Sequence, residues 1–283
     1  MPASSEKTVL ITGTSSGIGA ACVEALVAEG GWQVLAGRRD GAEPQTSPGA
    51  GVTPIDLDVT SEASIAAAAS RVHELTGGRL DALVNNAGIP GAGPVETVPM
   101  DEVRATIETN LIGQFAVTQA FLPQIRAGRG RVVFISSLGG RVAFPYASPY
   151  HASKWGLEAL AESLRAEMAP LEVAVSLVEP ASMKTEIWAK GRSSLDESRA
   201  RMTDEQRSVY GEALAGFDEQ LASQEDSEDP SMVAEKVIEA LTSSSPAERY
   251  LVGQGARTLT LLKPLVPEAI FDRISQRLAS GGS

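Results

Sequence analysis

Seven short apolar runs alternate along this chain with segments whose apolar residues recur at helical spacing. The runs lie at residues 8–12, 32–37, 52–55, 81–85, 131–136, 173–178 and 249–252. Strands that alternate with helices favour a parallel sheet with crossover helices on its faces. No internal repeat or linker divides the 283 residues. The alternation therefore predicts a single α/β domain over residues 1–283.

Four segments between these runs carry an apolar stripe typical of a helix. They lie at residues 18–26, 65–75, 103–121 and 157–168, and Ser61 is placed to cap the second. The lone cysteine, Cys22, lies on the first stripe and is predicted to be a core residue, since it has no partner for an internal disulfide. We also expect structural roles for His73 and His151. The stripes themselves predict core packing and carry no functional message.

Three segments depart from this alternation. Residues 40–51 are rich in glycine and proline, so the crossover helix expected there is predicted to be lost or reduced to a loop. Residues 181–229 contain no predicted strand and are expected to form a substrate lid. Asp229 and Pro230 predict the start of a helix. Residues 256–280 are expected to form a C-terminal helical extension. The expected helical face of the lid consists of Val209, Ala213, Leu214, Phe217 and Leu221, and that of the extension of Ile270, Phe271, Ile274 and Leu278.

The charge balance limits the partners of the chain. A formal net charge of −12 disfavours nucleic acid and anionic membranes, because both require a basic face. No apolar stretch approaches the roughly 18 residues of a membrane span, and the polar residues 1–7 do not resemble a secretory signal. We therefore expect a cytoplasmic protein without a membrane span. A weak membrane-surface role for the C-terminal extension is a minor alternative.

A glycine-rich turn, Thr12-Gly13-Thr14-Ser15-Ser16-Gly17-Ile18-Gly19, joins the first apolar run to the first helical stripe. Glycines at such a turn allow close backbone approach to a pyrophosphate, and the free N–H groups of the following helix bind it. Gly13 would make the turn, Gly17 would admit the pyrophosphate and Gly19 would let the helix pack on the sheet. An ordinary strand–helix turn is the alternative. The position after a strand and before an apolar helix favours a dinucleotide site.

Tyr150 and Lys154 are four residues apart, so on a helix they share one face. A phenol has a pKa of about 10, and a nearby ammonium lowers it by favouring the phenolate. Such a pair can move a proton to or from an alcohol oxygen. Ser137, at the end of the fifth run, is placed to hydrogen-bond that oxygen. Each residue alone has a bland alternative, surface decoration for the pair and a turn for the serine. Combined with the glycine turn, they predict hydride transfer.

The spacing of the glycine turn, together with Asn85-Asn86-Ala87-Gly88, Asn110, Ser137, Tyr150 and Lys154, resembles the short-chain dehydrogenase/reductase family. The resemblance extends from residue 7 to about residue 185, and more loosely to residue 252. It implies a Rossmann-type, doubly wound, seven-stranded parallel sheet of order 3-2-1-4-5-6-7 with helices on both faces. It also implies a homodimer or homotetramer formed through the helices that start near Asp101 and Tyr150.

The resemblance also implies residue roles. Asn110, Ser137, Tyr150 and Lys154 would be catalytic, with Asn110 holding a water in a proton relay to Lys154. By itself, Asn110 would instead indicate an irregularity in its helix. Asp58 would contact the adenine, and Thr185 would fix the nicotinamide carboxamide, although Ala181 replaces the usual glycine between Pro180 and Thr185. No metal site is predicted. The predicted cofactor-binding residues are Gly13, Ser15, Ser16, Gly17, Ile18, Gly19, Arg38, Arg39, Asp58, Val59, Asn85, Asn86, Ala87, Gly88, Tyr150, Lys154, Pro180 and Thr185.

Arg38 and Arg39, at the end of the second run, decide the expected cofactor. An acidic residue there would accept hydrogen bonds from the ribose hydroxyls of NAD(H), whereas guanidinium groups suit the 2′-phosphate of NADP(H). NADP(H) is therefore favoured over NAD(H). In the alternative interpretation the arginines are exposed loop charges and Asp40 binds the ribose. Ser16 is not basic, so a second phosphate anchor found in many NADP-dependent relatives is absent.

The expected substrate is lipophilic, because the residues after Ser137 and at the start of the lid are largely apolar. The Ser-x-Gly-Gly turn at Ser137, the segment 145–150 and the segment 249–253 look most like those of hydroxysteroid and retinol dehydrogenases, which implies a steroid, retinoid or lipid-like carbonyl or alcohol. The alternatives are a reductase of small ketones or acyl chains, a cofactor-binding sensor without catalysis, and an isomerase or dehydratase. The predicted substrate-binding residues are Ser137, Leu138, Phe144, Tyr146, Tyr150, Met183 and Trp188.

Overall fold

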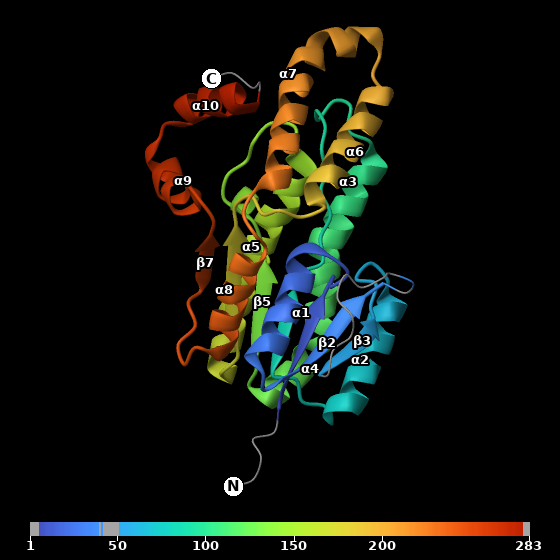
Figure 1. Ribbon diagram of the computed structural model, residues 1–283, viewed down its shortest axis with the longest axis vertical. Helices are drawn as coiled ribbons and strands as arrows, with labels where there is room; N and C mark the ends of the chain where they lie inside the picture. Colours follow the sequence, from blue (N-terminus) through green and yellow to red (C-terminus); the bar gives the residue numbers. More distant parts are fainter. Residues whose placement is uncertain (1–5, 40, 42–50, 280–283) are drawn as a thin grey trace.

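The computed structural model describes residues 6–39, 41 and 51–279 (Figure 1). Seven parallel strands form one sheet in the order β3-β2-β1-β4-β5-β6-β7, so the predicted topology is confirmed. Most of the expected loop at 40–51 and the alternative ribose ligand Asp40 lie outside the described residues, as does the side chain of Leu278. The strands are β1 Lys7–Thr12, β2 Trp32–Arg38, β3 Val52–Asp56, β4 Ala82–Asn85, β5 Arg131–Ile135, β6 Ala174–Pro180 and β7 Arg249–Val252.

Helices cover both faces of the sheet because strand side chains alternate between the faces. On β1, Leu10 packs into one core cluster with Phe121 and Leu157, while Val9 and Ile11 pack into the other. The helices behind the first cluster are α2 Glu62–Thr76, α4 Gly113–Gly128 and α5 Ser148–Met168, and those behind the second are α1 Gly17–Glu29 and α8 Ser231–Thr242. Ser61 caps α2 as predicted, accepting a hydrogen bond from the Ser64 N–H.

The single long helix expected over 103–121 is wrong in one respect. It consists of α3 Met100–Ile107, a π-helical segment η1 Glu108–Ile112, and α4. The buried Asn110 lies in the π segment, and its side chain exchanges hydrogen bonds with the backbone of Ile89. A π segment re-aims residues within a helix. The hydrogen bonds between Asn110 and Ile89 therefore occur where the helix changes to π-helical geometry. The spacing of the apolar residues alone does not reveal this change.

The expected lid consists of two helices, α6 Ile187–Ala200 and α7 Asp204–Ser223, which extend beyond the sheet in Figure 1. Thr203 and Gln206 form a capping box at the start of α7. Leu214, Phe217 and Leu221 are buried as the stripe predicts. Val209, predicted to lie on the same face, is 67% exposed, so the predicted face is wrong at this position.

The remaining elements follow the lid. The helix predicted to start at Asp229 and Pro230 is α8, whose N-cap is Pro230; Asp229 lies one residue earlier, and its carboxylate accepts from the Ser231 N–H at 2.8 Å. After β7 come α9 Ala256–Leu262, a 3-10 turn η5 at Lys263–Leu265, and α10 Glu268–Ala279, which form the expected C-terminal extension. Short 3-10 turns also occur as η2 Leu138–Gly140, η3 Ala169–Leu171 and η4 Gln224–Asp226. Within the described ranges, no helix combines the length and apolar character needed to cross a bilayer.

Candidate active site

A cavity of about 640 Å³ lies at the carboxyl ends of β1 to β6, between the sheet and the lid. In parallel α/β sheets this edge is where ligands bind. The segments that follow the strands converge there although they are far apart in sequence. Among the sequence-predicted residues, those lining the cavity are Gly13, Ser15, Ser16, Gly17, Ile18, Arg38, Arg39, Asp58, Val59, Asn86, Ala87, Gly88, Ser137, Tyr150, Lys154, Pro180, Met183, Thr185 and Trp188.

The glycine turn forms a closely packed backbone cradle at one end of this cavity. Gly13 has φ +69°, and a Cβ there would lie 2.8 Å from Cα of Ala87. A Cβ at Gly19 would lie 2.2 Å from the Gly13 carbonyl oxygen. The Asn86 amide donates to the carbonyls of Thr12 and Gly13, each at 2.9 Å, which fastens the turn to the end of β4. The turn leads directly into α1, so the backbone N–H groups of the turn and of the start of α1 form a set of donors that fits a dinucleotide's pyrophosphate.

Arg38 and Arg39 lie along the cavity from the glycine turn, together with Asp58. The Asp58 carboxylate accepts from the hydroxyl and the N–H of Thr60, at 2.7 and 2.9 Å. These hydrogen bonds lower the pKa of Asp58, and Arg39 adds a smaller effect in the same direction. This end of the cavity thus holds two guanidinium groups and an ionised carboxylate.

Tyr150 and Lys154 are both on α5 and both face the cavity. Lys154 is 4% exposed; its Nζ donates to the Ile135 carbonyl at 2.8 Å and lies 5.8 Å from the centroid of the Tyr150 ring. Burial lowers the pKa of Lys154 to about 8, which the charge of Glu158 partly opposes. Burial raises the pKa of Tyr150, and a hydrogen bond with Ser137 partly opposes the rise.

This direction differs from the lowered Tyr150 pKa expected from the sequence. Spacing alone shows that an ammonium shares the face of α5, but not that the phenol is shielded from water. Desolvation penalises the phenolate, and here it is the largest influence on Tyr150. A phenol with a raised pKa is protonated at neutral pH and is therefore ready to donate a proton.

Ser137 starts the loop that borders the cavity beyond β5. Its hydroxyl accepts from the Gly139 N–H at 3.0 Å. His151, buried on α5, holds the same loop: its Nε2 accepts from the Phe144 N–H at 3.1 Å, and its Nδ1 lies 2.9 Å from the Gly139 carbonyl. This pattern requires a neutral ring with the proton on Nδ1. The structural role expected for His151 agrees with these contacts.

Asn110 does not line the cavity but lies directly behind it. Its amide nitrogen donates to the Ile89 carbonyl at 2.9 Å and to the Ser153 hydroxyl at 3.0 Å. Ser153 in turn donates to the Tyr150 carbonyl at 2.7 Å. Asn110 therefore ties the segment after β4 to the helical turn that carries Tyr150.

Five other sequence-predicted residues are also not among those that line the cavity. Gly19 packs behind the glycine turn, Asn85 donates to Thr118 inside the core, and Leu138 is half-buried in η2. Phe144 packs on Phe271 of α10 with ring centroids 6.4 Å apart. Tyr146 packs on Phe217 of the lid, 5.6 Å away.

Several lining residues are absent from the sequence-predicted set. Phe217 and Leu221 face the cavity from α7, and Gly191 faces it from α6. The apolar stripe of α7 signals that Phe217 and Leu221 are buried, but not that the space beneath them is open. The segment 89–92, after β4, completes the wall, and its composition carries no comparable signal.

The short chain dehydrogenase family model matches residues 7–196. The match spans more than half of the chain and includes β1 to β6, the glycine turn and the Tyr150–Lys154 pair. The chain therefore belongs to the short-chain dehydrogenase family, and it is an oxidoreductase of that class.

Curated relatives match over nearly the whole chain. Human retinol dehydrogenase 16 is 36% identical over 95% of this chain and 87% of its own length. Bovine 17-beta-hydroxysteroid dehydrogenase type 6 is 35% identical over 96% of this chain and 88% of its own. The NADPH-dependent 3-dehydrocapnine reductase of Ornithobacterium rhinotracheale is 32% identical, with 94% of each chain covered. The predicted likeness to hydroxysteroid and retinol dehydrogenases is confirmed.

Solved structures share the fold. A short chain dehydrogenase from Burkholderia cenocepacia J2315, in complex with NADP, has a TM-score of 0.74 and 26% identity, with 95% of this chain and 97% of that chain covered. A short chain dehydrogenase/reductase from Burkholderia phymatum, in complex with NAD, has a TM-score of 0.77 and 25% identity, with 92% and 93% covered. The fold thus accommodates either nicotinamide cofactor.

Proposed function

We propose that this protein is an NADP(H)-dependent oxidoreductase that interconverts a carbonyl and a primary or secondary alcohol on a lipophilic molecule. One observation carries the proposal: a single cavity joins the glycine cradle to Ser137, Tyr150 and Lys154, and continues under apolar lid residues such as Phe217. A nucleotide and an apolar substrate can therefore meet at the hydroxyl of Tyr150.

The proton chemistry follows from the side chains at that meeting point. When bound, the nicotinamide cofactor supplies or accepts the hydride. In the reducing direction Tyr150 donates its proton to the carbonyl oxygen, and in the oxidising direction it takes the proton back. Ser137, which is near enough to Tyr150 to influence its pKa, donates to the same substrate oxygen. Lys154 is placed to bind the ribose hydroxyls and to add positive charge beside the phenol.

The lipophilic substrate is supported by the lid side of the cavity, to which Trp188, Phe217 and Leu221 contribute. An apolar wall of this kind recognises a ligand by shape and burial rather than by charge. The names of the relatives, a retinol dehydrogenase and a 17-beta-hydroxysteroid dehydrogenase, point to substrates of the same character. A small ketone would leave much of this wall in contact with water.

The test follows nicotinamide absorbance with NADPH, NADH and their oxidised forms against steroids, retinoids, acyl substrates and small carbonyls. We expect the highest kcat/KM for a lipophilic compound. Turnover of small polar carbonyls alone would contradict the substrate class. Tight cofactor binding without turnover on any compound would instead favour a cofactor-binding sensor.

Cofactor preference is expected to depend on Arg38 and Arg39. Replacing both by Gln removes two charged donors from the nucleoside end of the cavity, and a hydrogen bond to a charged group contributes roughly 1.5–3 kcal/mol. The Kd for NADPH should therefore rise about 10- to 100-fold, while the Kd for NADH changes little. Fluorescence titration of both cofactors measures this. A matched control is Arg257→Gln on α9, an exposed arginine. Equal weakening of NADH and NADPH would show that the arginines do not read the 2′-phosphate.

We also propose that the chain self-associates through η1, α4 and α5. Ile112, Phe115 and Trp155 on these elements are each about half exposed, and large apolar side chains that share a surface mark interaction sites. The double variant Phe115→Glu/Trp155→Glu should convert a dimer or tetramer into monomers in sedimentation velocity. Val209→Glu, on the exposed start of α7, is the control. A wild-type protein that sediments as a monomer would contradict the proposal.

A further inference from the structure

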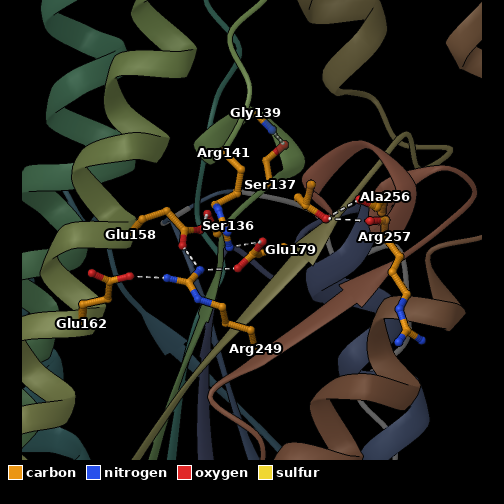
Figure 2. A network of polar contacts seen from close by, with 11 residues as sticks. Ser136, Ser137, Gly139, Arg141, Glu158, Glu162, Glu179, Arg249, Ala256 and Arg257 are labelled. Carbon is orange, nitrogen blue, oxygen red and sulfur yellow. Dashed lines mark hydrogen bonds and ion pairs between the residues drawn. The ribbon is translucent and has the colours of Figure 1, made fainter. Parts of the chain in front are cut away.

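A partly buried network of charged residues lies beside Ser136 and Ser137 (Figure 2). Arg249, at the start of β7, forms ion pairs with Glu158 and Glu162 of α5 and with Glu179 of β6. Arg141, in the loop after Ser137, lies 3.5 Å from Glu179. Four segments of the chain therefore meet through charged groups beside the site.

Glu158 connects this network to the candidate catalytic residues. It follows Tyr150 and Lys154 at the same four-residue spacing on α5, so the three side chains share one helical face. Its carboxylate accepts from the hydroxyl of Ser136, the residue immediately before Ser137. Gly140 closes the arrangement, since a Cβ there would lie within about 3 Å of Glu158, Ser136 and the Lys154 carbonyl.

A carboxylate buried to this degree requires a compensating partner. Glu158 is 6% exposed and Glu179 is fully buried, and transfer of such a charge from water costs several kcal/mol unless it is paired. Arg249 supplies the pairing for both. An apolar residue at position 158 would avoid the cost, so packing alone does not explain a glutamate there.

We propose that Glu158 is a positioning residue for the reaction: held by Arg249 and Ser136, it fixes the Lys154 turn of α5 against the end of β5 and keeps Lys154 charged. The inference rests on the proposed function, because it assigns Glu158 a role through Lys154. The charge of Glu158 opposes the fall in the Lys154 pKa that burial causes, which agrees with the geometry.

Several elements contribute other ionisable side chains around Lys154 and Glu158. Replacing Glu158 alone leaves all of these side chains in the sequence. His151 on α5 points instead to Gly139 and Phe144. A shift that follows the replacement therefore belongs to Glu158. The groups are Tyr150 and Glu162 on α5, Arg141 after η2, Glu179 on β6 and Arg249 on β7. Glu108 on η1 and the pair Glu186 and Lys190 at the start of α6 line the same cavity as Lys154.

The first measurement is the pKa of Lys154 itself, by competitive labelling of amines with a small acylating reagent across pH, read by mass spectrometry. Removal of a nearby negative charge makes an ammonium easier to deprotonate, so Glu158→Gln should lower the Lys154 pKa by about 1 unit. Glu158→Asp keeps the charge and should retain the wild-type value. The matched control is Glu162→Gln, at a carboxylate that is 59% exposed and should leave the value unchanged because solvent screens it.

The second measurement is the pH dependence of kcat/KM with the best substrate. The Tyr150–Lys154 pair titrates as a unit, so Glu158→Gln should move both apparent pKa values to lower pH. A folded Glu158→Gln variant whose Lys154 pKa and pH profile match the wild type would overturn the proposal, whatever its activity. A Glu162→Gln shift as large as that of Glu158→Gln would overturn it too.

Two features keep the test decisive. Should Glu158→Gln fail to fold because Arg249 loses a partner, the double variant Glu158→Gln/Arg249→Gln is compared with Arg249→Gln alone, so that the two proteins differ only in the Glu158 charge. The double variant should have the lower Lys154 pKa of the two, and equal values contradict the proposal. The labelling needs neither cofactor nor substrate. Absence of turnover on every compound would therefore count against the proposed function, while the role of Glu158 would be decided separately.

Discussion

Tyr150→Phe is expected to abolish turnover while leaving the fold and cofactor binding intact. The substitution removes only the phenolic oxygen, which is the candidate proton donor and acceptor. Proton transfer by a positioned side chain contributes roughly 10²- to 10⁴-fold to rate, so kcat should fall by a factor in that range. Because the ring remains to fill its buried site, the midpoint of thermal unfolding should change little.

The control for this variant is Tyr250→Phe. The Tyr250 hydroxyl accepts from the Ala247 N–H at 2.9 Å, outside the cavity lining. Its loss should reduce stability by about 1 kcal/mol without a comparable loss of kcat. Steady-state kinetics, thermal unfolding and NADPH titration of both variants separate the two outcomes. A Tyr150→Phe enzyme that retains more than a tenth of the wild-type kcat would assign the proton transfer to another group.

The sheet was predictable because each strand is short, apolar and bounded by polar or glycine residues. Predicted and observed strands agree to within two residues, and the family resemblance supplied the strand order. Asn110 by itself indicated a helix irregularity, and one occurs there. Its π-helical form was not predictable, since it accompanies hydrogen bonds with Ile89, a residue outside that helix. Local periodicity carries no record of such a contact.

In the candidate site, too, local sequence patterns were predictable and contacts between distant residues were not. Glycine spacing and the Tyr150–Lys154 pair are local patterns, so the sequence reveals them. The bonds of Arg249 to Glu158 and Glu179 join residues 91 and 70 positions apart, and nothing in the flanking sequence marks them as partners. The burial that raises the Tyr150 pKa likewise arises from packing. The main residues of the candidate site could therefore be predicted from the sequence, whereas the burial and ion pairs that set their pKa values required the folded structure.

Gly19→Ala is expected to damage both stability and cofactor binding, although it adds a single methyl group. That carbon would lie 2.2 Å from the Gly13 carbonyl oxygen and 2.5 Å from the Asn86 amide nitrogen. The carbonyl belongs to the backbone of the turn, and Asn86 fastens the turn to β4, so neither can move without displacing the cradle. Overpacking of a well-packed site costs about 1–3 kcal/mol.

We therefore expect the free energy of unfolding to fall by about 2 kcal/mol and the Kd for NADPH to rise at least about 10-fold, as the loss of one charge-assisted hydrogen bond would produce. Gly211→Ala is the matched control: Gly211 lies inside α7 with open space around its Cα, so alanine there should stabilise the helix by up to about 1 kcal/mol. If Gly19→Ala lowers the free energy of unfolding and Gly211→Ala raises it, the loss at position 19 is caused by the close packing of the glycine cradle and not by the replacement of a glycine as such. Denaturant unfolding and NADPH titration decide the matter. Wild-type stability and affinity in Gly19→Ala would mean that the turn and α1 are not in the close contact on which the proposed cofactor site depends.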